Sequence, residues 1–140
     1  LGGYLAALYA ARHPDKVRRV VLMAPAFGFP RRWPQRLGPQ TMAEWERTGW
    51  LPVYHYAEQA DRRVHWELIA DGRRYEDYPE VTQPCLIFHG SKDDVVDAAW
   101  SREFAANRPN VELHVVESGH ELTDVVEPMW ERVSAFVTQP

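Results

Sequence analysis

Two loops of this chain carry side chains whose types and spacing suit acid–base chemistry. Asp93 and Asp94 follow a short apolar run at 85–88, and His120 follows a second apolar run at 111–116. Both runs have the length of buried strands, and each breaks into a polar loop that contains glycine. In open α/β sheets, the binding and catalytic residues lie just beyond the carboxyl ends of the strands, which is where these side chains are expected. The sequence therefore predicts a carboxylate and an imidazole side by side at one sheet edge.

The rest of the chain alternates between helical and strand patterns around these two runs. The expected elements are a helix over 1–13, strands over 17–23, 85–88 and 111–116, and helices over 98–107 and 124–137. Pro14 stops the first helix, and Asp97 is a suitable N-cap for the helix that begins at 98. This alternation indicates an α/β layer with parallel strands and flanking helices.

Between 28 and 78 the pattern changes, because prolines punctuate the segment and four of the six tryptophans lie in it. Two amphipathic helices are expected there. One covers 41–47 with Thr41 as its N-cap, and the other covers 61–70 and ends at Gly72. We interpret 28–78 as a short helical insertion into the sheet layer.

The composition excludes several classes of partner. The chain has 140 residues with 45% hydrophobic side chains, the size of one domain and enough to bury a core. A net charge of -4 gives no basic field for nucleic acid, and no stretch approaches the roughly 18 apolar residues that span a membrane. The single cysteine, Cys85, lies inside a strand run and is expected to be a small buried apolar residue. A small-molecule partner is the remaining default.

The order of these features resembles the C-terminal half of an α/β-hydrolase. The matching residues are a small-residue helix after Gly2-Gly3, a strand that ends in Ala24-Pro25, the inserted segment, HGSKD at 89–93, and SGH at 118–120 before a last helix. The similarity is greatest to the small bacterial esterase-like branch that includes YqiA and YcfP. It implies a partial α/β-hydrolase domain over 1–140, with 28–78 as a cap insertion.

The resemblance also implies a role for each matching residue. In that family the nucleophile is the serine of G-x-S-x-G, on a strained turn between a strand and a helix. Leu1-Gly2 resembles the two residues after this serine, which would immediately precede Leu1 and lie outside this chain. Asp93 would orient His120, His120 would act as general base and then general acid, and the backbone N–H of Leu1 would help to hold the oxyanion. The resemblance implies no metal and no organic cofactor.

Several of these residues could also have a different role. The family spacing of three residues after Gly90 favours Asp93 as the acid, with Asp94 as the second candidate, although both could instead only solvate a turn. His89 ends a buried strand and is interpreted as structural. The glycine pair at 2–3 is also compatible with an ordinary, closely packed helix start.

Aromatic side chains of the insertion are candidates for an acyl or alcohol pocket, namely Trp33, Trp45, Trp50 and Tyr54. The alternative is that they form the ordinary core of a short helical insertion. The arginines and carboxylates of the same segment are interpreted as a solvated surface.

We therefore expect the full-length protein to be a bacterial, cytoplasmic serine hydrolase that cleaves small carboxylic esters through an acyl-enzyme. The 140-residue chain alone is expected to be inactive, because removal of a triad nucleophile costs on the order of a million-fold in turnover. An aspartate nucleophile would instead make a dehalogenase or an epoxide hydrolase, and a cysteine would make a dienelactone-type hydrolase. Leu1 favours serine, because the aspartate enzymes are expected to carry an aromatic residue there. A non-catalytic binding module with the same fold is the third alternative.

Overall fold

The computed structural model describes residues 1–55 and 58–139, and its elements group into two compact units. One unit combines Leu1–Phe27 with Tyr78–Pro140, and the other is Gly28–Asp77. The second unit corresponds closely to the segment interpreted as an insertion. Its role as a cap stays a prediction.

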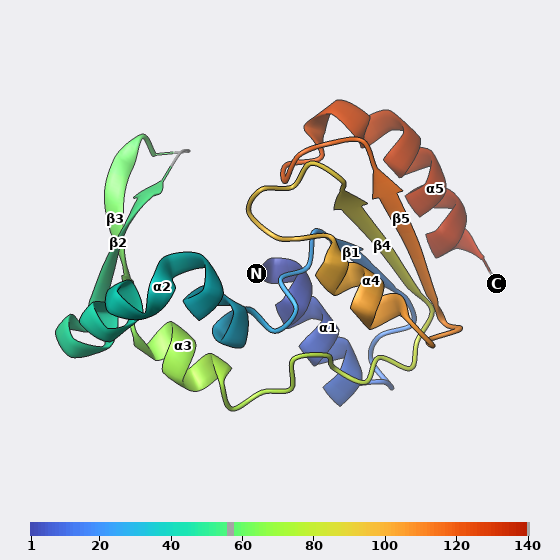
Figure 1. Cartoon of the computed structure of the whole chain (residues 1–140). Helices are drawn as coiled ribbons and strands as arrows, with labels where there is room; N and C mark the ends of the chain where they lie inside the picture. Colours follow the sequence, from blue (N-terminus) through green and yellow to red (C-terminus); the bar gives the residue numbers. More distant parts are fainter. Residues whose placement is uncertain (56–57, 140) are drawn as a thin grey trace. The chain divides into compact units, whose positions relative to one another are not determined.

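The first unit is an α/β layer (Figure 1). Its elements are α1 (Gly2–Arg12), β1 (Val20–Met23), β4 (Cys85–Gly90), α4 (Ala99–Ala105), β5 (Val111–Val116), the 3-10 turn η1 (Thr123–Val125) and α5 (Val126–Thr138). The three strands form a parallel sheet in the order β1-β4-β5. The parallel strands and flanking helices expected from the sequence are thus confirmed, with bounds that differ by a few residues at the ends of elements.

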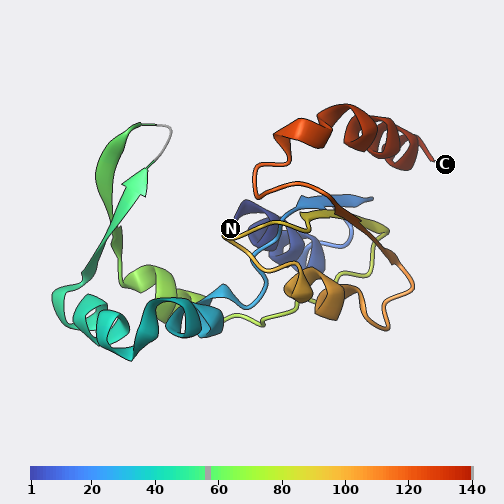
Figure 2. The ribbon, with the colours of Figure 1, turned by 45° about the horizontal axis from the view of Figure 1, so that its top comes forward.

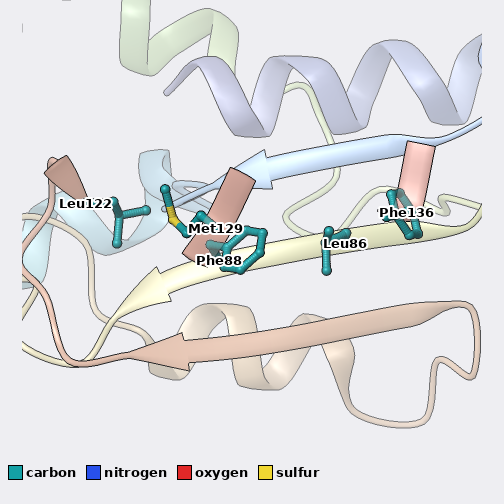
Figure 3. Close-up of a cluster of buried hydrophobic side chains, with 5 residues drawn as sticks. All are labelled: Leu86, Phe88, Leu122, Met129 and Phe136. Carbon is teal, nitrogen blue, oxygen red and sulfur yellow. The ribbon is translucent and has the colours of Figure 1, made fainter. Parts of the chain in front are cut away.

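Helices cover both faces of this sheet. Side chains alternate along a strand, so neighbours on β4 face opposite sides. Leu86 and Phe88 point towards α5, where they pack with Leu122, Met129 and Phe136 (Figure 3). The helices α1 and α4 lie on the other face (Figure 2). Every residue of β4 is buried as a result, which explains why its sequence is almost continuously apolar.

The N-cap of α4 is Ala98 and not Asp97, so the predicted cap is wrong by one residue, although Asp97 still accepts a hydrogen bond at this helix start. Asp97 precedes the N-cap residue Ala98, and its carboxylate accepts a hydrogen bond of 2.8 Å from the amide of Ala99. Cys85 is buried as expected, and burial raises the pKa of its thiol to about 12. Within the part of the chain that the structure describes, no helix has both the length and the apolar character that a membrane crossing requires.

The second unit differs from the sequence prediction in its secondary structure. It consists of α2 (Phe29–Thr48), β2 (Trp50–His55), β3 (Ala60–His65) and α3 (Glu67–Gly72), and the two strands form an antiparallel hairpin. The helix predicted over 61–70 is therefore wrong in its first half, although its end at Gly72 is confirmed. Pairing with all six residues of β2 outweighs the local helical pattern of this arginine-rich segment.

The helix α2 is also longer than the short helix predicted over 41–47. It contains a break at Gly38, whose φ of 79° and ψ of 160° are not helical. The helix restarts at Pro39, a residue that favours the first helical position because its fixed φ suits the helix and it lacks an N–H. Thr41 consequently lies inside the second half of α2, and its predicted role as N-cap is wrong.

Candidate active site

The loops that follow β4 and β5 are joined by backbone hydrogen bonds. The amide of Ser91 donates to the carbonyl oxygen of Val116 at 2.7 Å, and the amide of Lys92 donates to that of Ser118 at 3.0 Å. Both bonds extend the pairing of the two strands beyond their ends. The loop with the adjacent carboxylates and the loop with His120 are therefore held together by the main chain itself.

Gly90 makes this close approach possible. A Cβ atom at this position would lie 2.3 Å from the carbonyl oxygen of Gly119 and 2.4 Å from that of Ser118. Both neighbours are backbone atoms that cannot move away without separating the loops. Glycine is thus required here by the spacing between the two loops.

The side chain of Asp93 is buried and accepts hydrogen bonds at both carboxylate oxygens. Its Oδ1 accepts from the amides of Val95 at 2.9 Å and Val96 at 2.8 Å, and its Oδ2 accepts from Nδ1 of His120 at 2.8 Å. Burial alone would raise the pKa of Asp93. The hydrogen bonds from Val96, His120 and Val95, together with the charge on His120, outweigh burial and hold that pKa below its usual value. Asp93 is therefore a charged carboxylate at neutral pH.

His120 is oriented by this carboxylate and remains open to solvent. Its side chain is 32% exposed, whereas that of Asp93 is fully buried. Because a carboxylate only accepts, Nδ1 of His120 carries the proton of the shared hydrogen bond, and the neutral ring has its lone pair on Nε2. Nε2 has no hydrogen-bond partner among residues 1–55 and 58–139. An imidazole held in this way can accept a proton from a nucleophile.

The loop of His120 is anchored on both sides of the imidazole. Before it, the buried Ser118 donates its hydroxyl proton to the carboxylate of Asp124. After it, Leu122 is 2% exposed and belongs to the core cluster beneath α5. These anchors limit the positions that the ring can adopt.

Asp94, the second candidate for the acid, lies in a different environment. Its side chain is exposed, and it makes no hydrogen bond or ion pair with the described residues. The structure brings Asp93 and not Asp94 to His120.

His89 contacts the same carboxylate, which the sequence interpretation did not anticipate. Its ring is fully buried, and Nε2 lies 3.3 Å from Oδ2 of Asp93. The sequence does contain one sign of such a contact, which is a histidine at the end of an otherwise apolar strand. A polar ring that is buried there must find hydrogen-bond partners. The sequence does not reveal which partners those are.

Leu1 lies at the carboxyl edge of the sheet. It is the N-cap residue of α1, so its backbone is at the positive end of the helix dipole. A Cβ on Gly3 would lie 3.1 Å from Cα of Pro25, so the first turn of α1 packs against the chain that leaves β1. Close packing thus explains Gly3. It does not explain Gly2, where a Cβ would meet nothing within 4 Å.

The four aromatic candidates of the insertion occupy different environments. Trp33 lines a pocket of about 240 Å³ together with Arg36, Leu37, Leu51 and Val53. Trp45 is buried and donates from Nε1 to the carbonyl oxygen of Val64 at 2.9 Å. Trp50 and Tyr54 are exposed. Of the four, Trp33 alone lines this pocket.

The site can supply a general base and an orienting acid. Asp93 and His120 have the geometry of the acid and base of a nucleophilic triad. In the described portion of the chain, no group of three or more histidine, cysteine, aspartate or glutamate side chains could hold a metal ion.

Comparison with known proteins places this chain in a family and a fold. The model of a family described as "Uncharacterised protein family (UPF0227)" matches residues 1–138. The solved structures that resemble the chain include alpha/beta hydrolase domain-containing protein 10 from mouse, with a TM-score of 0.77 and 21% identity over 96% of this chain and 58% of that chain. A putative hydrolase from Agrobacterium vitis S4 has a TM-score of 0.79 and 21% identity, with coverage of 96% and 57%. Est1E from Butyrivibrio proteoclasticus has a TM-score of 0.67 and 20% identity, with coverage of 96% and 56%.

These structural similarities establish the fold. At such low identity they extend to the fold alone, and the expected α/β-hydrolase sheet is confirmed. The chain spans a little over half the length of the structures that it matches. The comparison with curated proteins found no match.

Proposed function

The chain belongs to the UPF0227 family and has an α/β-hydrolase fold, and from this premise we propose that the full-length protein is a serine hydrolase of carboxylic esters. The observation that carries this proposal is the hydrogen bond of 2.8 Å between Nδ1 of His120 and the buried carboxylate of Asp93. This bond leaves Nε2 of a partly exposed imidazole available for proton transfer. The chain also resembles the structure of an esterase from Pyrococcus furiosus, with a TM-score of 0.57 and 20% identity, which agrees with this reaction class.

In the proposed reaction, the nucleophile is a serine directly before Leu1. Nε2 of His120 takes the proton of its hydroxyl as the oxygen attacks the ester carbonyl, and then gives that proton to the leaving alcohol. A water molecule, deprotonated in the same way, cleaves the acyl-enzyme and releases the carboxylic acid. Asp93 remains ionised throughout and stabilises the imidazolium form of His120.

The backbone N–H of Leu1 is proposed as one donor of the oxyanion hole. This assignment is supported by its place at the N-terminal end of α1, where the helix dipole favours negative charge. The second donor is proposed to come from a part of the protein outside this chain.

We also propose that the pocket beside Trp33 binds the apolar part of the ester. Its volume of about 240 Å³ suits a ring or a short alkyl chain, and four of its five lining residues are apolar. A structure of Est1E has ferulic acid bound, which makes aromatic acyl groups a class of substrate worth testing. Small esters with aromatic or short aliphatic acyl groups are therefore the proposed substrates.

The test is the hydrolysis of p-nitrophenyl acetate, butyrate and octanoate, and of methyl ferulate, by the full-length protein. The variant His120→Ala should lose at least about 10³-fold in kcat, because proton transfer loses its base. His114→Ala is the matched control, since His114 is similarly exposed and lies on β5 away from the Asp93 carboxylate. Equal activity of His120→Ala and wild type would contradict the proposed function.

A further inference from the structure

Both ring nitrogens of His89 have partners in the interior of the first unit. Nε2 lies 2.8 Å from the carbonyl oxygen of Val96 and 3.3 Å from Oδ2 of Asp93. Nδ1 lies 2.7 Å from Oγ of Ser101, a residue of α4 that is itself fully buried. One of the partners of this buried ring is thus the carboxylate that orients His120.

The partners determine which nitrogen of His89 carries the proton. The carbonyl oxygen of Val96 can only accept, so Nε2 must be the donor. The same N–H group also faces Oδ2 of Asp93. In the neutral ring Nδ1 is then an acceptor, and the hydroxyl of Ser101 donates to it. The carbonyl oxygen of Val96 therefore selects the tautomer that presents an N–H group to Asp93, and the hydroxyl of Ser101 satisfies Nδ1 in that tautomer.

His89 also acts on Asp93 through Val96. Its Nε2–H group holds the carbonyl oxygen of Val96, and the amide of Val96 donates to Oδ1 of Asp93 at 2.8 Å. His89 thus contacts Oδ2 directly and fixes the residue that binds Oδ1. A carboxylate enclosed on both oxygens cannot rotate away from His120.

We propose that His89 is a positioning residue for the Asp93–His120 pair, held in the required tautomer by the carbonyl oxygen of Val96. This inference rests on the proposed function for its kinetic consequence, but its structural part depends only on the contacts of His89. His89 does not touch the reacting atoms. It acts by keeping Oδ2 of Asp93 in line with Nδ1 of His120.

Two substitutions separate this role from simple packing. In His89→Gln the side-chain amide reaches the place of Nε2, so an N–H group can still face Val96 and Asp93. In His89→Asn the amide reaches only the place of Nδ1, so the contact with Ser101 can persist while the donor to Asp93 is lost. Both variants remove the imidazole ring, and their melting temperatures measure the packing that each one loses.

The experiment uses the full-length protein that contains this chain, with proton NMR and ester hydrolysis as its two readouts. The downfield resonance of the Nδ1–H proton of His120 should be present in wild type and in His89→Gln. In His89→Asn it should shift upfield or broaden through exchange with solvent. We expect about a tenfold loss of kcat in His89→Asn with KM nearly unchanged, and recovery of most of that loss in His89→Gln.

The inference is overturned if His89→Asn keeps the resonance of His120 at its wild-type position. It is also overturned if the two variants lose kcat equally and in step with their melting temperatures, because that pattern indicates packing alone. The NMR readout needs no turnover. A wild-type protein that hydrolyses no ester would therefore refute the proposed function, while the resonance would still decide the role of His89.

Discussion

Replacement of Asp93 by asparagine tests the orientation of His120, because the structure determines which way the new amide must face. Oδ1 of Asp93 accepts from the amides of Val95 and Val96 at 2.9 and 2.8 Å. Only the carbonyl oxygen of asparagine can accept both bonds, so its NH2 group must replace Oδ2 and face Nδ1 of His120. Nδ1 must then accept a hydrogen bond, and the ring proton moves to Nε2.

An imidazole with its proton on Nε2 cannot take the proton of a nucleophile. The same change of tautomer in a serine protease triad lowers kcat by about 10⁴-fold, which corresponds to about 5.4 kcal/mol of transition-state stabilisation. We expect Asp93→Asn in the full-length protein to lose about 10³-fold to 10⁴-fold in kcat. KM should change little, because the side chain of Asp93 is fully buried and cannot reach the substrate.

The assay is the steady-state hydrolysis of p-nitrophenyl butyrate, with melting temperatures measured on the same preparations. Asp94→Asn is the matched control, since it makes the same chemical change at the neighbouring, exposed carboxylate. Its kcat should stay within about twofold of wild type, as expected for a surface substitution. A kcat of Asp93→Asn close to wild type, or a larger loss in Asp94→Asn, would refute the assignment of the acid.

Three other features can be tested by a change of pH or by substitution. Hydrogen bonds hold the pKa of Asp93 in the folded protein below its value in the unfolded chain. Ionised Asp93 therefore stabilises the fold above about pH 4. This contribution is lost as the pH falls through the lower pKa of the folded state. Acid unfolding followed by circular dichroism should therefore be steeper below about pH 4 for wild type than for Asp93→Asn. Gly90→Ala should lower both the melting temperature and kcat, because its Cβ would lie 2.3 Å from a backbone oxygen. Gly119→Ala is the control. Its Cβ would meet only one atom, at 4.0 Å, so its melting temperature and kcat should stay close to those of the wild type. Trp33→Ala should raise KM for aromatic and octanoyl esters by about tenfold, because the ester loses apolar contact. Trp50→Ala, at an exposed tryptophan, is the control. An unchanged KM in Trp33→Ala would contradict the proposal that this pocket binds the ester.

The sequence predicts the sheet and the Asp93–His120 pair well, for a physical reason. A strand buried on both faces is apolar along most of its length, so the apolar run at 85–88 indicates β4, which the structure extends to Gly90. The glycine at its end indicates the break into a polar loop, and the structure adds that Gly90 is closely packed against the loop of His120. Parallel strands then bring the two loops to one edge.

The sequence does not predict features that depend on partners distant in the chain or on exposed strands. The segment 61–70 has a local helical pattern, but its first half pairs with β2 and becomes a strand. The contact of His89 with Asp93 depends on where Val96 and Ser101 lie after folding. No local pattern around the histidine encodes that arrangement.

The most direct test of the central claim is active-site labelling of the full-length protein with a fluorophosphonate, followed by mass spectrometric location of the modified residue. We expect a single label on a serine that immediately precedes Leu1, and a strongly reduced labelling rate in His120→Ala. Absence of label from an otherwise folded protein, or a label on any other residue, would contradict the proposed serine mechanism. An aspartate or cysteine at that position would keep the fold and the acid–base pair and would change the reaction class.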